Sequence, residues 1–217
     1  MKLAERLAQA IAGGVHRIGQ ISIRPDVAGA AYALCHIDDE GTDPHALEIH
    51  NGSAAAREIS TWAEDGHYRF TKGELSLKRG WLLRLSSAEE LRQALDGFYP
   101  AAAGLWFANQ DGHLDVQHLR DKLNRQTGMY RFARDLSDAG AQRLVREVCG
   151  PGHCCVKKIL WQIDVTTPLE DSEASRFDGV VGNIDRREAV PLLCREACNH
   201  FVAEARKASK AENEAKR

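Results

Sequence analysis

Apolar and polar residues alternate along the first part of the chain, which is the pattern of β-strands. Residues 15–24 (VHRIGQISIR) alternate loosely, and residues 30–37 (AAYALCHI) and 46–50 (ALEIH) are two further short apolar runs. Residues 67–70 and 79–85 are strand candidates on either side of a polar turn. The pattern therefore predicts a small sheet.

Two helices are predicted in the same part of the chain. Residues 1–14 form a short amphipathic run, and the charge of Glu5 within it is unlike a signal peptide. Asn51 or Ser53 can cap a second helix over residues 54–64. Residues 1–84 are thus predicted to be an α+β module.

Helical spacing dominates after residue 85. Ser87 and Glu90 have the spacing of a capping box, in which both side chains satisfy free backbone donors at a helix start. Pro100 can open the next helix, and Gly112 can end it. Ser137 can cap a later helix that leads directly to Cys149.

The last part of the chain is predicted to be a long connection followed by a helix. Residues 164–190 are acidic, polar and irregular, and Pro191 can begin the final helix. The fold class is therefore α+β: an N-terminal module over 1–84, then a mainly helical region over 85–208, with a cysteine-rich part at about 145–208. Residues 209–217 are predicted to be a flexible tail.

Charge and hydropathy exclude some function classes. The chain of 217 residues has a formal net charge of −2 with mixed signs, so we expect no broad surface for nucleic acid. No stretch approaches the roughly 20 apolar residues that span a membrane. A cytoplasmic protein is expected.

Six cysteines change this picture, because five of them lie between residues 149 and 198. A cytosolic location keeps thiols reduced, which disfavours a disulfide framework. Cys35 stands alone in an apolar run and is predicted to be a small buried residue.

The clustered cysteines have the spacing of metal ligands. Cys149 is followed by a Gly-Pro-Gly-His loop and then by Cys154 and Cys155, while Cys194 and Cys198 are four residues apart. On one helix, that second pair would point to the same side. Four thiolates are what a 4Fe-4S cluster requires, and the loop offers backbone N–H groups to its sulfides.

The residues alone leave alternatives open. Taking Cys155 as the ligand gives C-x5-C and C-x3-C, a spacing that resembles the cluster motif of sirohaem-dependent sulfite and nitrite reductases. A structural zinc site, with Cys154 or Cys155, remains an alternative, as do unligated buried cysteines. A disulfide between the adjacent pair would be strained. His153 is interpreted as a surface residue of the loop rather than a ligand.

The neighbours of these cysteines fit either reading. Lys157, Lys158 and Arg195 can offset the charge of a thiolate-bound cluster, although solvated surface cations are commoner. Trp161 and Phe201 can screen a cluster from water, and we expect both to line the core.

Several runs of the sequence together resemble a known family: ALEIHNGSAAAREI, YRFTKGELSLKRGWLLRLSSAEELRQALDGFYPAA, RQTGMY, CCVKKILW and PLLCREACNHFVAEARKA. They are similar to the C-terminal stabilising and 4Fe-4S domains of multidomain proteins with a CbiX-like (sirohydrochlorin cobaltochelatase-like) domain. The resemblance covers roughly residues 45–208. It implies a 4Fe-4S cluster held by Cys149, Cys155, Cys194 and Cys198, with Cys155 favoured over Cys154.

The resemblance does not extend to a chelatase domain, since His16, His36, His45 and His50 are scattered rather than grouped. It implies an accessory protein of tetrapyrrole metabolism (sirohydrochlorin and cobalamin biosynthesis), whose cluster transfers electrons to, or senses redox state for, a partner such as a sirohydrochlorin chelatase.

Two other hypotheses remain. In the first, the metal only stabilises the C-terminal core, and the protein is a protein-interaction module. An enzyme is less favoured, because no recognisable catalytic motif is present and Tyr99, Tyr130, His113 and His118 fit core or surface positions better.

Overall fold

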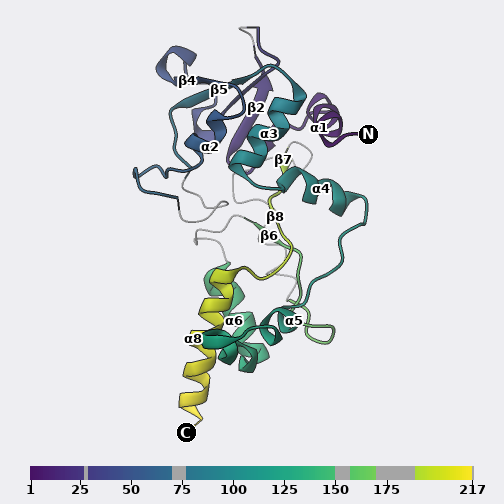
Figure 1. Cartoon of the computed structure of the whole chain (residues 1–217), viewed down its shortest axis with the longest axis vertical. Coiled ribbons are helices and arrows are strands. Elements are labelled where there is room, and N and C mark those ends of the chain that lie inside the picture. The colour runs from purple at the N-terminus through teal and green to yellow at the C-terminus, as the bar shows by residue number, and fades with distance from the viewer. Residues whose placement is uncertain (27–28, 70–76, 150–156, 170–188, 217) are drawn as a thin grey trace. The chain divides into compact units, whose positions relative to one another are not determined.

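A computed structural model describes residues 1–26, 29–69, 77–149, 157–169 and 189–216 (Figure 1). Its described residues form two compact units, one of residues 1–113 with 189–192, the other of residues 114–169 with 193–216. Helices stand beside a mixed sheet, so the α+β prediction is confirmed. Within the described part, no helix combines the length and apolar character needed to cross a bilayer.

The first unit is built on a six-stranded sheet in the order β4-β5-β3-β2-β1-β7. The strands are β1 (Arg17–Ile18), β2 (Ile21–Pro25), β3 (Tyr32–His36), β4 (Glu48–Asn51), β5 (Trp81–Leu85) and β7 (Ala189–Val190). The pairs β4–β5 and β1–β7 are parallel, and the other pairs are antiparallel.

Residues 15–24, predicted as one strand, contain the turn of a hairpin between β1 and β2. Gly19 in this turn has φ +57°, which disfavours a side chain. A Cβ at Gly19 would also stand 2.8 Å from the ring of Tyr99 and 2.9 Å from Leu192. The hydroxyl of Tyr99 accepts a hydrogen bond from the Gln20 N–H at 3.1 Å, which fixes the turn against the core.

The described residues of the first unit form the helices α1 (Leu3–Ala12), α2 (Ala55–Ile59), α3 (Ala88–Phe98) and α4 (Ala102–Gln110). Two short 3-10 turns are η1 (Ile37–Asp39) and η2 (Pro44–Ala46). Helix α3 packs on β5, α1 and α2, and the rings of Trp81 and Phe98 stack at 5.1 Å. This packing places the division between the units near residue 113 rather than at the predicted 84, because α3 needs the sheet to cover its apolar face.

Some local predictions for this unit were wrong. The N-cap of α2 is Ala54, whose side chain makes no capping bond, in place of Asn51 or Ser53. The segment predicted as a strand at 67–70 forms only an isolated bridge between Tyr68 and Trp62, and residue 70 lies outside the described part.

The capping box predicted at the start of α3 is half present. The hydroxyl of Ser87 accepts the Glu90 N–H at 3.2 Å, as predicted. The Glu90 carboxylate, however, accepts from the N–H of Ser86, at 2.7 Å. The helix start is therefore capped twice, with the second bond one residue earlier than expected.

The second unit is mainly helical. Its elements are α5 (Leu119–Asn124), the 3-10 helix η3 (Gly128–Asp135), α6 (Asp138–Val148), α8 (Asn199–Ala215) and a two-stranded parallel sheet of β6 (Lys158–Ile159) and β8 (Leu193–Cys194). One apolar core joins them, formed by Leu119, Leu123, Ala133, Leu136, Ala141, Leu144, Val145, Cys149, Ile159, Trp161, Ile163, Leu169, Ala197, Phe201, Val202 and Ala205.

The helix predicted to begin at Pro191 starts only at Asn199, because the preceding residues form β7 and β8. The segment predicted as a flexible tail, residues 209–217, is mostly part of this helix. Helix α8 continues to Ala215, and Glu212 accepts hydrogen bonds from the N–H and the hydroxyl of Ser137, at 3.0 and 2.7 Å. The helix end is therefore tied to the start of α6.

Candidate metal centre

Cys149 stands at the C-terminal end of α6, as the sequence predicted. Ser137 caps the start of this helix by accepting the Gly140 N–H at 3.0 Å, and Leu144 and Val145 bury its inner face. Cys149 itself is 7% exposed and belongs to the apolar core of the second unit. A thiolate buried at a helix C-terminus needs a positive partner, and a metal supplies one.

Cys194 is the last residue of β8 and is half-buried against the same core. It lies opposite Ile159 of β6, and its carbonyl accepts the Leu160 N–H at 2.9 Å. Its thiol donates to the carbonyl oxygen of Glu196 at 3.2 Å. The β6–β8 pairing therefore fixes the backbone that carries this sulfur.

Cys198 is the N-cap of α8. Its sulfur accepts a hydrogen bond from the Phe201 N–H at 3.4 Å, and its side chain is exposed. The N-terminus of a helix favours negative charge, because its first N–H groups lack backbone acceptors. This position suits a thiolate ligand.

The predicted placement of Cys194 and Cys198 on one helical face was wrong. One sulfur ends a strand and the other begins a helix, with a turn of three residues between them. The reason is local: Cys198 caps the helix in place of an oxygen-bearing residue, so no helix extends back to Cys194.

Cys154, Cys155 and His153 fall in the 150–156 segment, outside the described residues. Among the described residues, no group of three or more His, Cys, Asp or Glu lies close enough to hold a metal ion. Cys149 belongs to the apolar core and Cys194 packs against it, whereas Cys198 is exposed. These three described cysteines do not form a complete site among themselves.

Cys35 is separate from this centre. It is fully buried in β3 of the first unit, as predicted. Burial raises the pKa of its thiol, which keeps the sulfur protonated and unsuited to metal binding.

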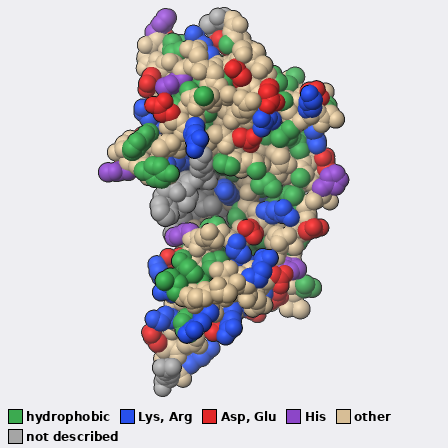
Figure 2. All heavy atoms as spheres, in the orientation of Figure 1, with side chains coloured by type: hydrophobic (Ala, Val, Ile, Leu, Met, Phe, Trp, Pro, Cys, Tyr) green, Lys and Arg blue, Asp and Glu red, His purple; other side chains and the backbone are tan. Residues whose placement is uncertain are grey.

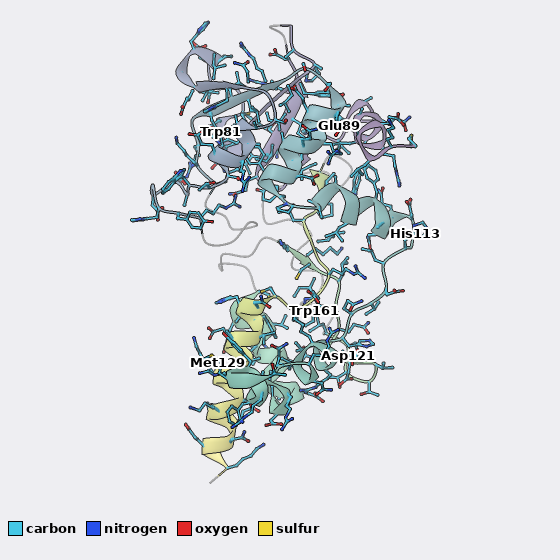
Figure 3. The ribbon with its side chains drawn as sticks, in the orientation of Figure 1. Trp81, Glu89, His113, Asp121, Met129 and Trp161 are labelled. Carbon is cyan, nitrogen blue, oxygen red and sulfur yellow. The ribbon has the colours of Figure 1, made fainter. Side chains whose placement is uncertain are left out.

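Trp161 lies between the β6–β8 sheet and the helices of the second unit (Figure 3). Its ring meets Phe201 edge-on, with the ring centroids 5.3 Å apart, so the prediction that both line the core is confirmed. Trp161 is only 2% exposed, and its indole N–H has no acceptor among the described groups. A buried N–H group without an acceptor lowers the stability of the fold, so such groups are normally hydrogen-bonded. A cysteine sulfur or a cluster sulfide would be such an acceptor.

An ion pair that the sequence did not reveal supports the turn between the two C-terminal cysteines. The ammonium of Lys122 lies 3.3 Å from the carboxylate of Glu196. Glu196 lies between Cys194 and Cys198, so the ion pair connects α5 to this turn. Lys122 and Glu196 are 74 positions apart in the sequence, so no local sequence pattern predicts the contact.

The other candidate residues from the sequence make contacts that support the fold. Tyr99 is buried at the Gln20 turn, and Tyr130 packs on the second core. His118 precedes α5, with Nδ1 3.6 Å from Asp121. His36 is buried in the first unit, and its ring accepts the Asp38 N–H at 3.1 Å.

Two family models match the chain in sequence. Residues 3–110 match the DR2241 stabilising domain, and residues 111–207 match a 4Fe-4S iron-sulfur cluster binding domain. The chain is a stabilising domain followed by a 4Fe-4S domain. The predicted resemblance is therefore confirmed, and the cofactor is a 4Fe-4S cluster rather than zinc. The two matches meet close to the division between the compact units.

The fold is similar to a solved structure, that of DR2241 from Deinococcus radiodurans. The TM-score is 0.75 at 23% identity, over 96% of this chain and 41% of that one. That protein is described as multi-domain, with structural similarity to chelatases and two additional novel domains. This chain therefore spans less than half of the protein that it resembles. A search of curated proteins found no match.

The residues of the 4Fe-4S domain fit this cofactor. Cys149 lies in the apolar core at a helix C-terminus, and Cys194 packs against that core at a strand end. Cys198 is exposed at a helix N-terminus. The buried indole N–H of Trp161 adds a donor that lacks an acceptor among the described groups. Iron–sulfur clusters take thiolate ligands and accept hydrogen bonds at sulfur.

Proposed function

We propose that Cys149, Cys155, Cys194 and Cys198 hold the cluster, and that the protein transfers single electrons or senses redox state. The observation that carries this proposal is the position of Cys198, whose sulfur accepts a backbone hydrogen bond at the start of α8. Such a bond favours a thiolate and stabilises the added negative charge of a reduced cofactor.

The residues around the site exclude water from the cluster and place positive charge near it. Trp161 and Phe201 form an apolar wall on the core side. Lys157 and Lys158 follow the cysteine loop and supply positive charge close to it in sequence. The cluster supplies one-electron chemistry, and the chain sets its potential through these contacts.

An anaerobic redox titration followed by electron paramagnetic resonance tests this role. We expect a reversible one-electron change at a potential that cellular donors reach. A cluster that stays in one oxidation state across that range would exclude electron transfer.

The partner that we propose is a sirohydrochlorin chelatase or another tetrapyrrole-pathway enzyme in the cytoplasm. Support comes from the domain composition, since DR2241 combines its additional domains with a chelatase-like part. In cells that carry this protein and make corrinoids, loss of the cluster through Cys198→Ser should lower corrinoid production. Unchanged production at equal protein levels would count against the link with cobalamin biosynthesis.

A structural role is the second candidate. The strands β6 and β8 have two residues each, so little backbone pairing holds the cysteine-bearing ends together. A metal centre there would staple α6, β8 and α8 in an interaction module. Unfolding of the 4Fe-4S domain on iron removal, with no accessible redox change, would favour this role over electron transfer.

A further inference from the structure

Residues 122–134 carry four cations and no acidic residue. The segment runs from α5 through η3, and Arg125, Arg131 and Arg134 are all exposed. Two apolar side chains stand among them. We define the arginine surface as Lys122, Arg125, Met129, Arg131, Phe132 and Arg134.

The apolar part of the arginine surface is open to solvent. Met129 is 64% exposed and Phe132 is 38% exposed. The guanidinium of Arg131 lies 4.9 Å from the centroid of the Phe132 ring. Arginine, methionine and aromatic residues are enriched where proteins meet other proteins. Basic and hydrophobic side chains stand side by side on the visible face of this unit (Figure 2).

Two of the cations have no ion-pair partner among the described residues. Lys122 pairs with Glu196, and Arg134 lies 3.5 Å from Asp135. Arg125 and Arg131 have no carboxylate within ion-pair distance in the described part of the chain. The surface therefore presents fixed positive charge beside an apolar centre, which complements an acidic partner.

The arginine surface is coupled to the candidate metal centre. Helix η3, which carries the exposed Met129, packs against α8 (Figure 3). Tyr130, between Met129 and Arg131, packs on the core that contains Cys149. At the other end, Lys122 holds Glu196 in the turn between the C-terminal cysteines. A partner bound here contacts elements that position the cysteines.

We propose that the arginine surface docks an acidic electron-transfer protein, which exchanges one electron with the cluster. This inference rests on the proposed redox function. One electron leaves the reduced partner and enters the oxidised cofactor, and no bond is made or broken. An apolar centre favours a protein over a nucleic acid, whose contacts are mainly to phosphate.

The test uses the full chain with its cluster and a reduced plant-type [2Fe–2S] ferredoxin of acidic surface as the probe. Stopped-flow absorbance under anaerobic conditions gives the second-order rate constant. The surface variant is Arg125→Glu with Arg131→Glu. The matched control is Lys210→Glu with Lys216→Glu, which makes the same charge change on exposed residues near the end of α8.

At low ionic strength we expect the surface variant to lose about tenfold or more in rate, and the control about twofold or less. The difference in rate between the two double variants should vanish near 1 M salt, where the Debye length is only about 3 Å. Met129→Gln should lower the rate at both salt concentrations, since it removes apolar contact without changing charge. Equal rates for the two double variants, or no loss in either, would overturn the proposal.

A small dye reductant separates this inference from the function on which it rests. The dye does not need a docking surface, so it should reduce the wild type and all variants equally. If it cannot reduce the wild type, the electron-transfer function fails, and the docking proposal fails with it. If the dye reduces all variants and the ferredoxin reduces the surface variant and the control variant at equal rates, only the docking proposal fails.

Discussion

The sulfur of Cys198 accepts a hydrogen bond from the backbone N–H of Phe201, 3.4 Å away, and thereby caps α8, the longest described helix of the 4Fe-4S domain. Cys198 therefore has two separable roles, as helix cap and as proposed cluster ligand. Serine is a good cap but a poor iron ligand, and alanine is neither.

Cys198→Ser should lose the cluster while keeping the helix content of the metal-free protein. Cys198→Ala should lose the cluster and also about 0.5–2 kcal/mol of stability, the usual range for removing a side-chain cap. Iron analysis and circular dichroism melting of the metal-free variants measure the two effects. A Cys198→Ser protein with wild-type iron would remove Cys198 from the ligand set, and Cys35→Ser serves as the control that keeps its iron.

The adjacent cysteines at 154 and 155 make a sharper comparison. Cys155→Ser should lose the cluster, whereas Cys154→Ser should retain it, because the resemblance seen in the sequence implies a ligand at the residue before the Val-Lys-Lys run. Absorbance near the cluster charge-transfer band, per mole of protein, measures retention. The reverse result would move the proposed ligand to Cys154.

Trp161→Phe should leave the cluster bound but lower its reduction potential. The indole N–H is buried without an acceptor among the described groups, and a bond from it to sulfur stabilises the reduced form. Phenylalanine keeps most of the packing against Phe201 and removes the donor. Trp106→Phe, in the stabilising domain, is the matched control. Equal potentials for both variants would show that Trp161 donates nothing to the centre.

The stabilising domain should lose stability in mild acid through His36. This residue is 2% exposed, and burial lowers its pKa, while Asp38 acts in the opposite direction. The unfolded chain then binds the proton more readily, so stability is present above the ordinary pKa of 6.5 and is lost as the pH falls below it.

Melting temperatures at pH 7.5 and pH 5 check this expectation. His36→Asn keeps an acceptor for the Asp38 N–H and should show a smaller acid-induced drop than the wild type. His45→Asn, at an exposed position, should behave like the wild type. If His36→Asn and the wild type lose equal stability, another group controls the acid response.

Local signals in the sequence predicted much of the fold. The Ser137 cap and the apolar stripe after it identify α6 and deliver Cys149 to its observed place. The α+β class followed from alternation early in the chain and helical spacing later. These features depend on neighbours within a few residues, which a single sequence displays directly.

Features that depend on distant contacts were missed. Helix α8 reaches Ala215 because Glu212 binds Ser137, a contact across 75 positions. Cys194 belongs to a strand because it pairs with Ile159, although its spacing from Cys198 suits a helix equally well. Spacing identified the cysteines as a group, but it could not show which element carries each one.

The cluster is the central claim, and its metal content tests it most directly. We expect anaerobic purification to give a brown protein with about four irons and no zinc per chain, and a broad absorption that bleaches on reduction. A colourless protein with one zinc per chain, unchanged after reconstitution with iron and sulfide, would contradict the account.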